Sequence, residues 1–142
     1  MTVDCTDSEG NVTEYIGTLN VEAYYTWTYG SDSYSMTVDL SYTDYTDYVA
    51  DTYSEKNARS VTKWATVTDY VVVDSTVQSI ADQLTTLYTK MNGSFALDQS
   101  FADFTLAFVQ ICYTYQYDEI LYGQEEYWAY PLETLFNGGG DC

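Results

Sequence analysis

The sequence has 142 residues, and its 22 Asp and Glu against 4 Lys and Arg give a net charge of −18 at pH 7. Such a charge repels phosphate groups and anionic lipid, which argues against nucleic-acid binding. Apolar residues make up 46% of the chain, enough for one domain with a core. No stretch of the sequence reaches the roughly 20 consecutive apolar residues that a membrane-spanning helix needs.

The N-terminal part predicts a tyrosine-rich β-hairpin. Residues 1–12 are polar, and we expect them to be loosely held. From Val21 to Tyr29 apolar and polar residues alternate, and they alternate again from Tyr34 to Tyr42 after the turn residues 30–33, Gly-Ser-Asp-Ser. Period-two alternation on both sides of a short glycine-containing turn is typical of two antiparallel strands.

A short helix and an extended link are expected next. Tyr45, Tyr48, Val49 and Tyr53 are spaced for one face of a helix, and packing in the core is favoured over a ligand-binding ladder of tyrosines. The β-branched stretch 64–73 predicts a strand or an extended link.

Two longer helices follow. The segment 75–78, Ser-Thr-Val-Gln, resembles a capping box, and Asn92-Gly93 suits the end of the first helix. Asp98 can cap the second helix. The expected apolar faces are Val77, Ile80, Ala81, Leu84, Leu87, Tyr88 and Met91 in the first helix, and Phe101, Phe104, Thr105, Phe108, Ile111, Cys112 and Tyr115 in the second. Cys112 is therefore expected to be a buried, inert thiol.

The fold class predicted is α+β, an antiparallel hairpin followed by a helical layer. Residues 117–126 read as an acidic loop, and no stretch has the composition of a linker between domains. We divide the chain into a β-rich part, 1–73, with the hairpin and short helix, and a helical part, 74–142.

The glycine run near residue 142 is the clearest functional signal. Asn137 is followed by Gly138-Gly139-Gly140-Asp141-Cys142. Glycines let the backbone approach a substrate closely, and a cysteine at the start of a helix can have a lowered thiol pKa. This pattern indicates a nucleophilic cysteine, although the sequence contains no histidine to act as its base.

Three segments, 108–110, 127–135 (Tyr-Trp-Ala-Tyr-Pro-Leu-Glu-Thr-Leu) and 138–142, together resemble the transglutaminase-like superfamily, which has a papain-like fold. The resemblance is nearest to archaeal and bacterial secreted members. It implies that Cys142 is the nucleophile of a Cys-His-Asp triad whose other two members come later in the chain. The sequence ends before them, so the resemblance implies an N-terminal fragment of the catalytic domain, which we expect to be inactive by itself.

In such a site a thiolate attacks a carbonyl carbon and forms a thioester, while backbone and side-chain donors stabilise the oxyanion. The backbone N–H of Cys142 could be one donor, and the side-chain amide of Gln110 is the candidate for a second. Gln110 falls off the apolar face of its helix, so it need not be buried. Asp141 could position the turn or cap a following helix, and Glu133 is expected to be a structural hydrogen-bonding partner.

Two function classes stay open. The first is a cysteine acyltransferase or peptidase with a protein or peptide substrate, for which hydrolysis and transamidation are not distinguished. The second is a non-catalytic extracellular surface, adhesion or calcium-dependent binding domain. No cofactor is expected, and calcium is a minority alternative. The sequons Asn11-Val12-Thr13 and Asn92-Gly93-Ser94 favour an extracellular or cell-surface location. Cys5 could pair with Cys112 or with another chain.

Overall fold

A computed structural model describes residues 2–6, 12–16, 19–56, 70–125 and 127–141. The elements of these ranges are, in chain order, β1 (Thr2–Thr6), β2 (Val12–Ile16), β3 (Asn20–Tyr29), β4 (Asp32–Ser41), α1 (Tyr42–Lys56), α2 (Ser75–Asn92), α3 (Gln99–Cys112), β5 (Thr114–Tyr115), α4 (Asp118–Leu121), α5 (Pro131–Asn137) and β6 (Gly139–Gly140). The mixture of helices with antiparallel hairpins confirms the α+β class.

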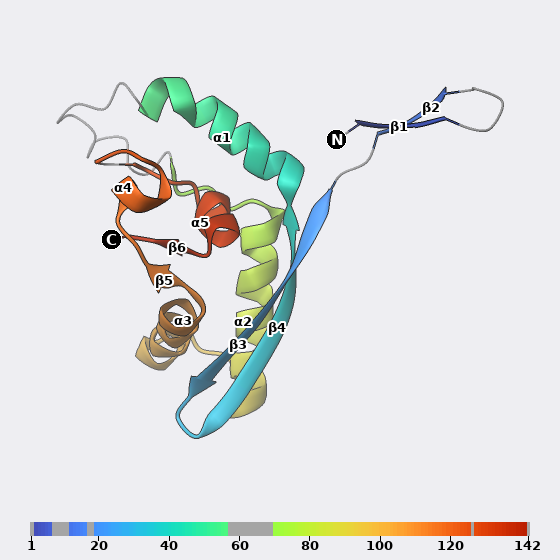
Figure 1. The fold of residues 1–142 in the computed structure, drawn as a ribbon. Helices are drawn as coiled ribbons and strands as arrows, with labels where there is room; N and C mark the ends of the chain where they lie inside the picture. Colours follow the sequence, from blue (N-terminus) through green and yellow to red (C-terminus); the bar gives the residue numbers. More distant parts are fainter. Residues whose placement is uncertain (1, 7–11, 17–18, 57–69, 126, 142) are drawn as a thin grey trace.

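The long β3–β4 hairpin forms one layer of the fold, and α2 and α3 pack on it (Figure 1). Its register runs from Asn20↔Ser41 to Tyr29↔Asp32, so the turn is the two residues Gly30-Ser31, with Gly30 at a φ of 62°. The predicted alternation is confirmed for most of the hairpin, because Trp27 is buried and Tyr24, on the other face, is 67% exposed. At the start of β3 the alternation in burial is lost, since Val21, on the same face as Trp27, is exposed.

The core lies between the hairpin and the two helices. Its buried apolar side chains are Trp27, Met36, Val38, Leu40, Ile80, Leu84, Tyr88, Phe104, Phe108 and Leu132. Phe104 is fully buried at its centre, and its ring meets those of Trp27, Tyr29 and Tyr34 at centroid distances of 5.8, 5.4 and 5.0 Å. Tyrosine therefore supplies much of the packing around the core, as the composition indicates.

Two predicted boundaries at the start of the chain are wrong. Residues 2–6 are not loose but pair with β2 in an antiparallel hairpin, which Figure 1 shows apart from the rest of the fold. Tyr42 begins α1 instead of ending the strand. Its N–H donates the last hydrogen bond of the hairpin to the Leu19 carbonyl at 2.9 Å. The Ser41 hydroxyl then accepts from the Asp44 N–H at 3.2 Å, in the first turn of the helix.

The short helix predicted around Tyr45 is confirmed as α1. Tyr45 and Tyr48 pack inward, where Tyr45 stacks on Phe136 of α5 at 4.4 Å and Tyr48 meets Tyr130 at 4.6 Å. Val49, which the prediction placed on the same face, is exposed. The side chain of Tyr53 lies outside the described set. These ring contacts join α1 to the C-terminal part of the chain.

The stretch 64–73 lies partly outside the described residues. In its described end, Val71 and Val73 are exposed and belong to no strand, so this end is an extended link. The link leads directly into Asp74 and α2.

Both long helices are confirmed, but α2 is capped differently from the prediction. Asp74, not Ser75, accepts from the Val77 N–H at 2.9 Å, and Gln78 donates to Asp82 instead of closing a capping box. A carboxylate at a helix N-terminus interacts favourably with the helix dipole, which a hydroxyl does less well. The predicted ends at Gly93 and the predicted cap Asp98 are both confirmed.

Three residues of the predicted apolar faces are exposed. Ala81 lies on the exposed side of α2. Ile111 is 52% exposed because it lies in the last turn of α3, beyond the turns in which Phe104 and Phe108 pack into the core. Tyr115 is exposed because the helix ends at Cys112 and residue 115 belongs to β5. The predicted acidic loop also contains the short helix α4, whose Asp118 is buried.

Candidate functional site

The segment that leads to residue 142 is held by α5. Pro131 occupies the first turn of this helix, where its missing N–H costs nothing, and Gly138 ends the helix with a left-handed φ of 67°. Gly139 and Gly140 then form β6, which pairs in parallel with Thr114 and Tyr115 of β5. The backbone of Gly139 and Gly140 is thus held by α5, which precedes it, and by its pairing with β5.

Glu133 anchors the start of α5 from inside the protein. Its side chain is 1% exposed, and its carboxylate accepts from the Tyr127 hydroxyl at 2.5 Å and from the Tyr130 N–H at 2.8 Å. Charge-assisted hydrogen bonds of this kind are about twice as strong as neutral ones. Glu133 therefore has the structural role expected from the sequence, and it ties residues 127–130 to the helix.

The three glycines at positions 138–140 differ in whether the structure requires glycine there. Gly138 adopts a backbone conformation that other residues rarely take. A Cβ on Gly139 would lie 2.5 Å from the Thr114 carbonyl oxygen, so pairing with β5 requires glycine there. At Gly140 a Cβ would meet the Thr134 methyl at 3.5 Å and the Thr134 hydroxyl oxygen at 3.8 Å, which are ordinary contacts. Backbone conformation thus explains Gly138 and close packing explains Gly139, and neither requires glycine at position 140.

An apolar cleft of about 640 Å³ borders Gly140 and Asp141. Its walls come from α2, α3, β5 and α5, and its apolar lining includes Val77, Ile80, Leu106, Val109, Pro131 and Leu135. The volume lies within the range of about 300–1,000 Å³ common for ligand sites. We call this hollow the apolar cleft.

The structure brings Gln110 to the same cleft. Gln110 is exposed, as its place off the buried face of α3 predicts, and it lines the cleft together with Gly140 and Asp141. Cys142, the predicted nucleophile, lies outside the described residues. Residues 108–110 and Gly140-Asp141, from two of the segments in the resemblance, therefore border one cleft.

The cleft carries little charge among the described residues. Asp141 is its one carboxylate, and Tyr113 on its wall is neutral, since burial, followed by the neighbouring Tyr25, raises the pKa of the Tyr113 hydroxyl well above its usual value. A thiolate in this field would have no described cation to stabilise it.

Leu106 and Val109 do not belong to the predicted apolar face of α3, although Val109 lies in the segment 108–110 of the resemblance. Both are exposed apolar residues on α3 outside the stripe that packs on the hairpin. Isolated exposed apolar residues are common, so their apolar character alone does not predict a site.

Cys112 is half-buried, not fully buried as expected. Its thiol donates to the Thr26 carbonyl at a sulphur–oxygen distance of 3.5 Å, and burial raises its pKa. It is a free thiol, and a raised pKa makes it a poor nucleophile at neutral pH.

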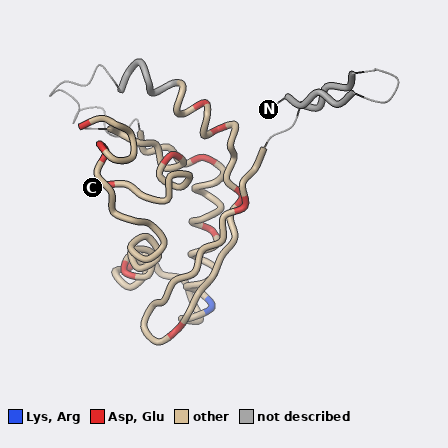
Figure 2. Tube along the Cα trace, in the orientation of Figure 1, with Lys and Arg blue, Asp and Glu red and all other residues tan. Residues whose placement is uncertain are grey.

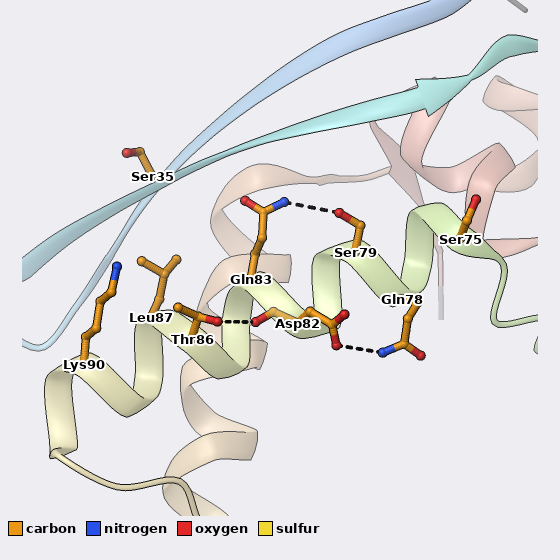
Figure 3. A pocket seen from close by; sticks show the side chains of 9 residues that line it. All are labelled: Ser35, Ser75, Gln78, Ser79, Asp82, Gln83, Thr86, Leu87 and Lys90. Atoms are coloured by element: carbon orange, nitrogen blue, oxygen red, sulfur yellow. Dashed lines mark hydrogen bonds between the residues drawn. The ribbon is translucent and has the colours of Figure 1, made fainter.

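A second hollow, of about 520 Å³, lies on α2 beside β4 (Figure 3). Figure 3 shows its polar side chains bonded along the helix: Gln78 donates to Asp82 at 2.8 Å and Gln83 to Ser79 at 3.5 Å. Gln83 also donates to the Thr37 carbonyl of β4 at 3.0 Å. The polar side chains of this hollow are thus bonded to its own walls, which does not mark it as a catalytic site.

The described part of the chain shows neither a cluster of metal-ligating side chains nor a membrane-spanning helix. The described ranges contain no group of three or more carboxylate or thiol side chains placed to hold a metal ion. Within the same ranges, no helix combines the length and apolar character of a membrane span. Comparison of the chain with protein-family models, curated proteins and solved structures finds no match.

Proposed function

We propose that the chain is the N-terminal part of a transglutaminase-like cysteine acyltransferase or peptidase that reacts through a thioester at Cys142. The observation that carries this proposal is the meeting of Gln110 and Gly140-Asp141 at one apolar cleft. Residues far apart in the sequence, from separate segments of the resemblance, border the same hollow, and Asp141 directly precedes Cys142 in the sequence.

The proposed reaction has two steps. The Cys142 thiolate attacks the carbonyl carbon of an amide, the new C–S bond replaces the C–N bond, and the amine leaves with a proton. Water or a second amine then attacks the thioester and releases the thiol. In both steps the Cys142 N–H and the Gln110 amide would donate to the oxyanion, and the apolar cleft would hold the neighbouring part of the substrate.

The general base has to come from outside these 142 residues, because the sequence contains no histidine. A thiol with a pKa of about 8.5 is mostly protonated at neutral pH. We therefore expect the 142-residue chain to be inactive and a longer parent protein that supplies a histidine and an aspartate to be active. The parent's place is proposed to be extracellular, and the sequon at Asn92 lies at the exposed end of α2, where a glycan would fit.

The test compares the 142-residue chain with the parent, using a glutamine peptide and a fluorescent amine. Incorporation of the amine and release of ammonia are both measured, so that hydrolysis is also detected. Cys142→Ser in the parent should abolish both products, and an undiminished rate would end the nucleophile assignment.

The role of Gln110 is tested separately. Gln110→Ala should lower the rate of the parent by about 10²–10³ if the amide is an oxyanion donor. Gln99→Ala is the matched control, since Gln99 is an exposed glutamine at the opposite end of α3. Equal rates in these two variants would remove Gln110 from the site and leave the role of Cys142 intact.

Gly140 offers a third test, because alanine fits there without a clash. If Gly140 serves the approach of the substrate, Gly140→Ala should fold normally and react slowly. A fully active Gly140→Ala parent would show that substrate does not pass over this residue.

A further inference from the structure

The apolar cleft offers more room than one glutamine side chain needs. Its volume of about 640 Å³ is that of a site for a drug-sized ligand, which is also the size of a short peptide segment. The proposed function puts the reactive glutamine of a substrate beside Gln110 and Gly140-Asp141, which border the cleft. The residues next to that glutamine would then lie along the remaining walls.

Aliphatic side chains from three helices make up most of those walls. They are Val77 and Ile80 of α2, Leu106 and Val109 of α3, and Pro131 and Leu135 of α5. Leu106 and Val109 are 51% and 44% exposed, although both are apolar. Exposed apolar groups gathered at a hollow are typical of ligand-binding grooves, because an apolar occupant removes them from water. The walls therefore favour an apolar occupant.

The charge around the cleft disfavours an acidic occupant. Among the described residues that line it, Asp141 carries the one charge, and the lining includes no basic side chain. The whole chain has a net charge of −18, and Figure 2 shows acidic residues spread along the described trace. A carboxylate between the aliphatic walls would lose hydration and meet charge of its own sign, so its binding would be opposed twice.

The same charge argues against a second copy of the chain as the occupant. Two copies of charge −18 repel each other when one approaches the cleft of the other. A neutral peptide segment does not meet this repulsion. The cleft is therefore suited to a segment of substrate and not to self-association.

We propose that the apolar cleft selects the substrate, binding a bulky apolar side chain next to the reactive glutamine and rejecting an acidic one at that place. Leu106 and Val109 pack on the apolar side chain, and Asp141 repels the acidic one. This role rests on the proposed function, whereas binding of the peptide requires no thioester and is measured without turnover.

The experiment titrates the 142-residue chain, carrying Cys142→Ala, with three acetylated and amidated tripeptides: Leu-Gln-Phe, Ser-Gln-Ser and Glu-Gln-Glu. Because each peptide has the same kind of residue on both sides of its glutamine, the result does not depend on the direction in which it lies. Binding is followed by the NMR amide signals of Val109 and Leu135. Leu-Gln-Phe should bind saturably and at least about tenfold more tightly than Ser-Gln-Ser, and Glu-Gln-Glu should not bind.

Variants locate the binding. Val109→Glu puts a charge on the cleft wall and should weaken the binding of Leu-Gln-Phe at least about tenfold. Ile111→Glu is the matched control, because Ile111 is 52% exposed on the same helix and does not line the cleft. Circular dichroism checks that both variants fold. If Val109→Glu does not, Leu106→Ala decides the matter, with an expected weakening of about three- to tenfold.

Three outcomes would overturn the role of the cleft in binding. These are equal affinities for Leu-Gln-Phe and Ser-Gln-Ser, an affinity that Val109→Glu leaves unchanged, and a dimer in sedimentation that Val109→Glu dissociates. The last outcome would make a second copy of the chain the occupant.

Turnover by the parent separates this role from the thioester at Cys142. The kcat/KM values of the parent should follow the same order of peptides as the affinities. Equal kcat/KM for all three peptides would refute selection by the cleft and leave the thioester intact. An inactive parent whose cleft still binds Leu-Gln-Phe selectively would count against the thioester and leave binding in the cleft intact.

Discussion

Glu133 gives the sharpest test of how the segment before residue 142 is built. Glu133→Ala removes the carboxylate that accepts hydrogen bonds from the part-buried Tyr127 hydroxyl and Tyr130 N–H, and it leaves a cavity where the buried side chain was. Hydrogen bonds to charged groups are worth about 1.5–3 kcal/mol each, and part of that is recovered by rearrangement, so we expect a loss of about 3–5 kcal/mol.

Glu133→Gln should cost less, about 1–2 kcal/mol. The amide keeps the shape of the side chain, and its oxygen can still accept from the Tyr130 N–H. The Tyr127 hydroxyl can rotate and accept from the amide nitrogen, whereas a backbone N–H has no such freedom. What is lost is the charge on the acceptor, which strengthens both bonds.

The assay is urea unfolding at neutral pH, with midpoint and slope compared for wild type, both variants and the control Glu119→Gln. Glu119 is an exposed carboxylate on α4, and its substitution should change stability by less than about 0.5 kcal/mol. The reasoning fails if Glu133→Gln and Glu119→Gln unfold at the same urea concentration, or if Glu133→Gln is as unstable as Glu133→Ala.

Three further predictions concern the core, a cap and the tyrosines. Phe104→Ala should destabilise the fold by about 3–5 kcal/mol in the same assay, whereas Leu106→Ala on the exposed side of α3 should cost far less; equal losses would contradict the assigned core. Asp74→Ala should cost about 1 kcal/mol and Ser75→Ala less than about 0.5 kcal/mol, and the reverse order would restore the cap predicted from sequence. Burial raises the pKa of Tyr25, Tyr113 and Tyr122 above the ordinary value of 10.0, so their contribution to stability is complete below pH 10 and is lost as the pH rises. Tyrosinate absorbance and circular dichroism should therefore change together at alkaline pH, and ionisation of all tyrosines in a fully folded chain would refute this.

The elements that the sequence predicts well are those with a long repeating pattern. The β3–β4 hairpin alternates over ten residues in each strand, and α2 and α3 place buried residues three and four apart. The predicted apolar faces are wrong at the ends of the helices, as at Ile111, which is exposed. Periodicity indicates the direction of a side chain but not how far the neighbouring element extends. Capping at Asp74 was missed because two adjacent residues, Asp74 and Ser75, are both good caps.

The candidate site was predictable only in part. Gln110 is a candidate because its side-chain amide can donate to an oxyanion and because it belongs to the segment 108–110 of the resemblance. Its position off the apolar face of α3 predicts that it need not be buried, and it is exposed. The cleft beside it depends on which side of α5 meets α2 and α3, and nothing in the local sequence of any one of these helices specifies that. The smaller pocket lined by Asp118, Tyr122 and Trp128 could not be predicted for a similar reason, since these are common residue types and no local pattern shows that they lie together.

The pairing of β5 with β6 explains why two such different hollows share Gly140 and Asp141. A parallel pair of two-residue strands has no alternation to detect, and it forms because Gly139 lacks the Cβ that would strike the Thr114 carbonyl. On one side of this pair lie the apolar residues of α3 and α5, which are exposed because the hairpin covers only the opposite side of α3. On the other side lie Asp118, Tyr122, Tyr127 and Trp128, which are held together by the bonds of Glu133 and Asp118 to Tyr127 and by the stacking of Tyr122 on Tyr127. The backbone beside Asp141 therefore separates an apolar hollow from one lined by aromatic rings and carboxylates.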